Sequence, residues 1–237
     1  MPDSSTDPFF QPYDREDIAY GDEPSAALAE FLKQVRPSGK ALDLGAGAGR
    51  DTIALAAAGL NVSAVDLSER GLERVRQRAN EAGLHNQVET FVADACEYPW
   101  APHTFQAIVA TTILDHVPAA SARPLWQRIC DGLDNHGFLY AEVHTTEDPG
   151  SEQMPGKLSD APVSETAGAV VNYFAPNQLA QWAADPESRL RILRYEERLE
   201  WDYTHGPEHL HGKAVLLAVR LGSHPDWYGQ PPAFPRR

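Results

Sequence analysis

The sequence predicts an α/β fold in which helices cover both faces of a mostly parallel sheet that ends in an antiparallel hairpin. Three observations support this prediction. Apolar strand-like runs alternate with helical patterns over residues 40–143, and short strand–helix connections of this kind produce parallel sheets. Three glycines, Gly45, Gly47 and Gly49, lie in one strand-to-helix turn. Two more strand-like runs follow each other near the C-terminus with no helix between them.

The first two thirds of the chain contain the alternating elements. Hydrophobic spacing predicts strands at 40–44, 61–66, 88–92, 105–110 and 137–143, and helices at 26–35, 48–58, 68–83 and 119–133. Ser68 suits the N-cap of the third of these helices. One face of that helix is apolar, being formed by Leu72, Val75, Ala79 and Ala82.

The last third of the chain has a different rhythm. Residues 145–170 form a long Pro/Gly/Ser-rich connection, which is typical of a functional or disordered loop. A short helix at 176–184 precedes strand-like runs at 190–203 and 213–221. The run 214–219 is apolar throughout, as expected of a central strand that is buried on both faces.

We therefore divide the chain into three parts. Residues 25–222 form the domain, and residues 223–237 form an irregular, Pro-rich C-terminal tail. Residues 1–24 form an N-terminal arm and a candidate lid, because they carry four aromatic residues: Phe9, Phe10, Tyr13 and Tyr20. Docking on the outer surface of the domain is the alternative for this arm.

Composition narrows the class of partner. The 237 residues carry a net charge of −14, which argues against a nucleic acid as partner. No run is long enough for a membrane helix, and the N-terminus lacks the pattern of a signal peptide. Two cysteines imply no disulfide framework. We expect a cytoplasmic monomer or homodimer that acts on a small molecule.

The glycine turn indicates the class of ligand. Glycines crowded after a strand let the backbone approach a ligand closely. A dinucleotide fingerprint would place a small residue at position 50, where this chain has Arg50. Asp43 would repel a pyrophosphate but attract an ammonium group. The turn therefore favours a cationic nucleotide without phosphate, namely S-adenosylmethionine.

The ends of the next strands carry suitable groups for the rest of this cofactor. Asp66 is placed to bind a ribose diol, and Asp94 to accept a hydrogen bond from the adenine amine. The predicted cofactor-binding residues are Asp43, Gly45, Ala46, Gly47, Gly49, Arg50, Asp66, Leu67, Asp94, Ala95 and Thr111. In the alternative interpretation the three acids are loop residues or helix caps.

With these residues in view, the chain resembles the class I S-adenosylmethionine-dependent methyltransferases, and most of all the tellurite-resistance protein B type. The resembling blocks are 42–50, 55–59, 65–66, 111–114 and 218–220. This resemblance implies a Rossmann-like, doubly wound sheet of seven strands. Ala46 stands where that type commonly has Cys, and the connection 145–170 has no counterpart in it.

The methyl acceptor is less clearly indicated. His116, just after the fourth strand, is the candidate catalytic base, with a packing or capping role as the alternative. His209 and His211 share a face if their segment is extended. With His205, they would form an oxyanion pocket or a metal site, although this spacing favours a solvated turn without metal. Tyr20 is a further candidate substrate residue.

We therefore expect in-line methyl transfer to a small molecule, such as a chalcogen oxyanion, a thiol or a small organic nucleophile. A non-catalytic S-adenosylmethionine-binding protein is the main alternative. A nicotinamide-dependent oxidoreductase is disfavoured by Asp43, Arg50 and the terminal hairpin.

Overall fold

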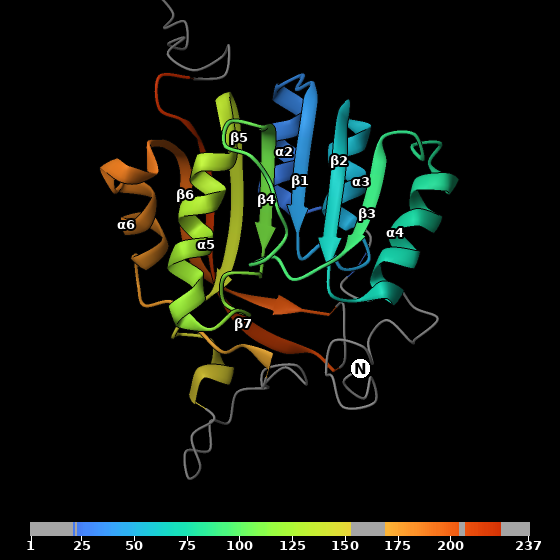
Figure 1. Ribbon diagram of the computed structural model, residues 1–237. Coiled ribbons are helices and arrows are strands. Elements are labelled where there is room, and N and C mark those ends of the chain that lie inside the picture. The colour runs from blue at the N-terminus through green and yellow to red at the C-terminus, as the bar shows by residue number, and fades with distance from the viewer. Residues whose placement is uncertain (1–20, 22, 153–168, 204–206, 224–237) are drawn as a thin grey trace, which may run out of the picture.

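The predicted sheet is present in the computed structural model, which describes residues 21, 23–152, 169–203 and 207–223. Seven strands form one sheet in the order β3-β2-β1-β4-β5-β7-β6 (Figure 1). The first five strands are parallel, and β7 pairs antiparallel to both β5 and β6. The α/β fold class, with its C-terminal antiparallel hairpin, is therefore confirmed.

The elements follow the predicted order. The strands are β1 (Gly39–Leu44), β2 (Leu60–Asp66), β3 (Val88–Val92), β4 (Phe105–Thr111), β5 (Leu133–His144), β6 (Leu190–Asp202) and β7 (His209–Arg220). The helices are α2 (Ala26–Gln34), α3 (Arg50–Ala57), α4 (Glu69–Glu81), α5 (Ala119–Gly132) and α6 (Gln178–Ala184), with 3-10 turns at Pro149–Glu152 and Pro186–Ser188. None of the helices in these ranges has the length and apolar character that a membrane-spanning helix requires.

The central strand β4 shows why both faces of the sheet need helices. Its side chains alternate in direction, and those of residues 107–110 are all fully buried. Ala107 and Val109 pack in one apolar cluster with residues of α2 and α3. Ile108 and Ala110 pack in the other with residues of α5 and α6. The two helix pairs therefore cover opposite faces (Figure 1).

The terminal hairpin adds β7 and β6 to the sheet on the far side of β5. Residues 214–219 are buried along β7, as predicted for a central strand. β7 begins at His209 instead of residue 213, because His209 and His211 are buried against neighbouring segments and continue the pairing with β6. Since β6 runs parallel to the first five strands, the β6–β7 turn lies at their carboxyl edge.

The two ends of α4 differ in how well they match the prediction. The N-cap role of Ser68 is confirmed, because its Oγ accepts a hydrogen bond from the Gly71 N–H at 3.1 Å. Ala82 follows the helix end and is exposed, so it does not extend the buried face.

The proposed lid residues Phe9, Phe10, Tyr13 and Tyr20 lie outside the described residues, as do His205 and residues 224–237.

Candidate functional site

The glycine turn between β1 and α3 has the backbone geometry that requires glycine. Gly45, Gly47 and Gly49 have φ values of 71°, 52° and 85°, a region that strains any side chain. A Cβ on Gly49 would also lie 2.8 Å from Cγ2 of Val75 in α4. In addition, a Cβ on Gly71 would lie 2.8 Å from the Gly47 carbonyl oxygen. The turn is therefore held tightly against the start of α4.

Beneath this turn, Asp43 is a buried acid with a shifted pKa. Its side chain accepts a hydrogen bond from Thr52 Oγ1 at 2.5 Å, and the residue is only 2% exposed. Burial, followed by the nearby charge of Asp51, raises the pKa of Asp43 to about 7. A cation placed beside Asp43 would favour its ionised form.

Asp66, at the end of β2, closes the glycine turn from the other side. Its carboxylate oxygens accept hydrogen bonds from the Gly47 N–H at 2.8 Å and the Ser68 N–H at 2.7 Å. The acid therefore positions the turn and the N-cap of α4 at once. Asp66 also lines the cavity that the turn borders.

The remaining predicted cofactor residues lie around the same space. Asp94 Oδ1 accepts a hydrogen bond from the Cys96 N–H at 2.7 Å, in the loop after β3. Thr111 Oγ1, at the end of β4, donates to Asp51 Oδ2 at 2.9 Å. Arg50 Nη2 donates to Ser25 Oγ at 3.1 Å. All the residues predicted to bind the cofactor line one cavity of about 520 Å³.

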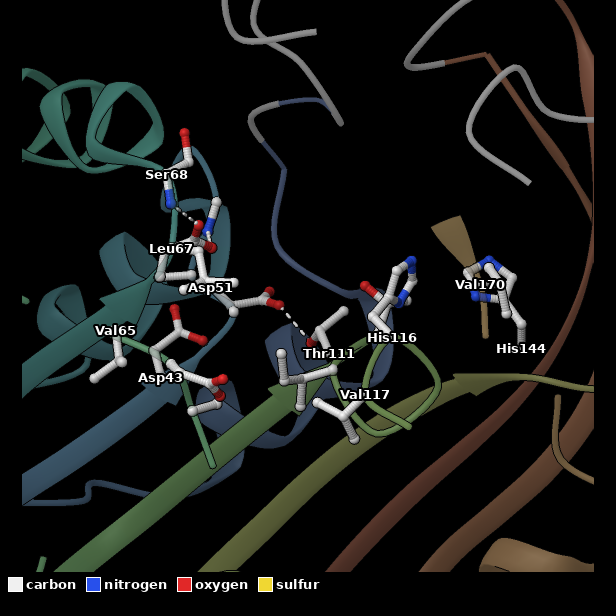
Figure 2. Close-up of a pocket in the computed structure, with 18 of the residues that line it drawn as sticks. Asp43, Asp51, Val65, Leu67, Ser68, Thr111, His116, Val117, His144 and Val170 are labelled. Carbon is white, nitrogen blue, oxygen red and sulfur yellow. Dashed lines mark hydrogen bonds between the residues drawn. The ribbon is translucent and has the colours of Figure 1, made fainter. Parts of the chain in front are cut away.

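The far end of the cavity is formed by histidines (Figure 2). The fully buried Asp115 bonds His116 Nδ1 at 3.2 Å through one oxygen and His144 Nδ1 at 2.5 Å through the other. Burial lowers the pKa of His116, but the Asp115 carboxylate and a hydrogen bond to the Thr112 backbone together raise it above the ordinary value. Figure 2 shows His116 and His144 at the opposite end of the site from Asp43.

Two more histidines, one of them lining the cavity, continue this row. His211 faces His144, with ring centroids 4.7 Å apart, and lines the cavity. Its Nδ1 lies 3.0 Å from Asp148 Oδ2, and its Nε2 lies 3.0 Å from Nε2 of His209. His209 is buried behind His211 and is not among the residues that line the cavity, contrary to a direct substrate contact. The expected solvated turn is therefore wrong for these two side chains, which are 1% and 5% exposed.

Sequence reasoning missed several residues of this site. Asp51, Asp115, His144 and Asp148 are buried and were not singled out. His144 could have been found, because it ends a strand as Asp66 and Thr111 do. Asp148 lies in the long connection after β5, where no local pattern marks it.

Comparison with known proteins finds a family match over the part of the chain that contains the glycine turn. Residues 41–137 match the family model described as "Methyltransferase domain". The chain is also similar to 27-O-demethylrifamycin SV methyltransferase of Amycolatopsis mediterranei (strain S699), with 31% identity over 110 residues. The matched region is 42% of this chain and 40% of that protein, so the chain spans less than half the length of this relative.

Two solved structures have a similar fold. TehB from Haemophilus influenzae aligns with a TM-score of 0.65 and 17% identity, over 83% of this chain and 62% of that chain. Magnesium protoporphyrin IX methyltransferase (ChlM) from Synechocystis PCC 6803, solved with bound SAH, aligns with a TM-score of 0.59 and 18% identity, over 82% of this chain and 80% of that chain. Residues 41–137 are thus similar to a methyltransferase domain, and the seven-stranded sheet has the fold of these two solved structures.

Proposed function

We propose that this protein is an S-adenosylmethionine-dependent methyltransferase that acts on a small molecule. The observation that carries the proposal is the single cavity of about 520 Å³ that joins the glycine turn to the row of histidines. One end offers backbone and carboxylate groups suited to a cationic nucleoside. The other offers ionisable groups suited to a nucleophile. Both reactants would thus occupy one enclosed space, as a direct transfer requires.

The donor end would hold the cofactor through groups from four strand ends. Ionised Asp43 would attract the ammonium group, and Asp66 would accept from the ribose hydroxyls. Asp94 would accept from the adenine amine. Leu67 is 65% exposed although it is apolar and lines the cavity, and an adenine ring lying on it would cover this surface. The other proposed cofactor residues are Gly45, Ala46, Gly47, Gly49, Arg50, Ala95 and Thr111.

In-line transfer of the methyl group needs alignment more than acid–base chemistry. Good alignment alone supplies roughly 7–11 kcal/mol of the barrier. For an acceptor that arrives protonated, we propose His116 as the base and Asp115 as the residue that orients its ring. Asp115 bonds Nδ1 of the His116 ring, and the Thr112 backbone bonds the same ring, so both groups orient the imidazole.

Within this class, we propose the chemistry of the tellurite-resistance protein B type, with a chalcogen oxyanion, a thiol or a small organic nucleophile as acceptor. Histidines and Lys213 at the far end of the cavity support an anionic or ionisable acceptor. Lys213 Nζ pairs with Glu200 Oε1 at 2.6 Å, which holds the ammonium group at the cavity wall. A monomer or homodimer in the cytoplasm, without a nucleic-acid partner, completes the proposal.

A cofactor-binding protein without methyl transfer is the second candidate. The observation that favours it is the buried Asp115, whose two oxygens already bond His116 and His144 and which therefore stabilises this region whether or not chemistry occurs there. This candidate binds the cofactor at the glycine turn in the same way. It differs only in that no methyl acceptor reacts at the histidine end of the cavity, the acceptor end.

Two experiments separate the candidates. Isothermal titration with S-adenosylhomocysteine should show binding and titration with NADH none; the reverse would overturn the proposal. Transfer of labelled methyl groups should then be assayed with tellurite, selenite, thiols and small phenols. Activity on any of them supports the enzyme, whereas binding of S-adenosylhomocysteine with no turnover across the panel supports the second candidate.

A substitution tests the proposed base. His116→Gln should lower kcat for a phenol about 10²- to 10⁴-fold and leave kcat for a pre-ionised oxyanion nearly unchanged. In the wild-type enzyme, kcat/KM for the phenol should rise with pH through a pKa above 6.5, because the neutral imidazole is the active form and the Asp115 carboxylate raises that pKa. Equal losses for both acceptors would assign His116 a structural role only.

A further inference from the structure

The His209–His211 pair at the start of β7 has an arrangement that requires a cation. His209 Nδ1 lies 2.6 Å from the Pro207 carbonyl oxygen, and His211 Nδ1 lies 3.0 Å from Asp148 Oδ2. Both acceptors lack a hydrogen, so each Nδ1 carries the proton. In a neutral imidazole the lone pair is then on Nε2. The two Nε2 atoms are nevertheless 3.0 Å apart, and two lone pairs at this distance repel unless a cation lies between or beside them.

A carboxylate completes this group. Asp202 pairs with His209 across the β6–β7 hairpin, and its Oδ2 lies 3.8 Å from His211 Nε2. The three residues offer ligand atoms that all lie within 4.8 Å of one another. A proton shared by two nitrogens needs no third group, whereas two imidazoles and a carboxylate around one point are a ligand set of a transition metal.

The surrounding contacts orient the two rings. In metal sites the ring nitrogen that does not bind the ion usually donates to a carboxylate or a backbone carbonyl. Here Asp148 orients His211 and the Pro207 carbonyl orients His209. Asp148 is itself held by the Gly150 N–H at 2.7 Å and the Gly212 N–H at 3.0 Å. Its position is therefore fixed from both sides.

We propose that Asp202, His209 and His211 bind one divalent transition-metal ion, with Zn²⁺ as the ion to test first. Two neighbouring groups, Asp115–His116–His144 and His144–Asp148–His211, also bring three ligand atoms together. In these groups the carboxylates already accept hydrogen bonds from the Nδ1 atoms, which makes them positioning groups. Asp202 and His211 line the cavity, and three protein ligands leave a coordination position for water or an acceptor molecule.

The site is tested by metal binding to the untagged protein, with neither cofactor nor acceptor present, so the result is independent of the proposed methyl transfer. Equilibrium dialysis against Zn²⁺ should give one ion per chain, and Co²⁺ should give the absorption of a low-symmetry site with nitrogen ligands. His209→Asn should weaken Zn²⁺ binding more than about 100-fold, and Asp148→Asn about 10- to 100-fold. His85→Asn, an exposed histidine after α4, should bind as the wild type does.

Two results would overturn the assignment. Absence of stoichiometric Zn²⁺ and Co²⁺ binding by the folded wild-type protein would show that a proton, and not a metal, lies between the rings. Loss of binding in His144→Asn with retention in His209→Asn would place the ion in a neighbouring group. If His209→Asn does not fold, as judged by circular dichroism, Asp202→Asn on the edge strand β6 is measured in its place and should show the same loss.

Discussion

The buried acid at the donor end makes the stability of the ligand-free protein depend on pH. Burial, followed by the charge of Asp51, raises the pKa of Asp43 from 3.8 to about 7. Between these values the folded state binds more protons than the unfolded state, so the free energy of unfolding decreases as pH rises through this window. Asp43→Asn should remove this dependence, because the amide stays neutral and its oxygen still accepts from Thr52.

The size of the effect follows from the two pKa values. Relative to a group that is always neutral, Asp43 costs the fold about 3 kcal/mol at pH 6 and about 4 kcal/mol at pH 8, at about 1.4 kcal/mol per pKa unit. The asparagine variant should therefore be more stable than the wild type by these amounts, as measured by urea unfolding without ligand. Glu73→Gln, at an exposed position of α4, removes the same charge and should give no such gain.

Cofactor binding should change in the opposite direction. Ionised Asp43 is the form that attracts an ammonium group, so the affinity of the wild type for S-adenosylhomocysteine should rise with pH up to about 7 and then level off. The Asp43→Asn variant should bind more weakly, with a flat profile over this range. Isothermal titration at several pH values measures both. Parallel profiles for the two proteins, or an asparagine variant no more stable than Glu73→Gln, would refute the role of Asp43.

Two further predictions concern the glycine contacts. Gly49→Ala and Gly83→Ala both place a Cβ at positive φ, but only the Gly49 Cβ meets a neighbour, Val75 Cγ2 at 2.8 Å. Backbone strain should cost both variants about 1–2 kcal/mol of unfolding free energy. Overpacking should cost Gly49→Ala about 1–3 kcal/mol more. Equal losses of unfolding free energy, measured by urea unfolding, would contradict the contact. Gly71→Ala should also destabilise the protein, although alanine favours helices by about 1 kcal/mol, because its Cβ would lie 2.8 Å from the Gly47 oxygen. A more stable Gly71→Ala variant would show that this contact relaxes freely.

The donor end could be predicted because local sequence specifies it. The turn 45–49 carries its glycines at the positions where φ is positive, and the acids of β1 and β2 stand at strand ends that the apolar runs reveal. In a parallel sheet these ends meet at one edge whatever the order of the outer strands. The predicted residues therefore came together around one cavity without any knowledge of tertiary contacts.

The starts of two strands, β5 and β7, were predicted less well than the other strand boundaries. β5 begins at Leu133, four residues before the predicted start, and the register shifts opposite Phe105. Gly137 lies at this irregularity, and a Cβ there would lie 2.8 Å from the Phe105 carbonyl oxygen. A glycine inside a strand signals such a bulge. β7 starts early for a different reason, because the buried His209 and His211 look like turn residues in the sequence.

The acceptor end could not be predicted because distant segments build it. Asp115 follows β4, His144 ends β5, and His211 is close to the start of β7. Asp148 reaches His211 only because the connection after β5 crosses β7 at Gly212, where a Cβ would overlap the Asp148 nitrogen. No periodicity encodes this crossing, since it depends on the antiparallel insertion of β7 beside β5.

This difference between the two ends has a consequence for how the site can change. The donor end depends on backbone conformation and on acids that also hold the glycine turn, as Asp66 does by accepting from the Gly47 N–H. Most substitutions there would therefore change the stability of the fold as well as cofactor binding. The acceptor end depends on side chains carried by separate segments, and His116 contributes to it from a turn that follows β4. Substitutions at such positions can alter which nucleophile is accepted while the donor end stays intact. Substitutions at the acceptor end should therefore change the KM of the acceptor more than the affinity for S-adenosylhomocysteine.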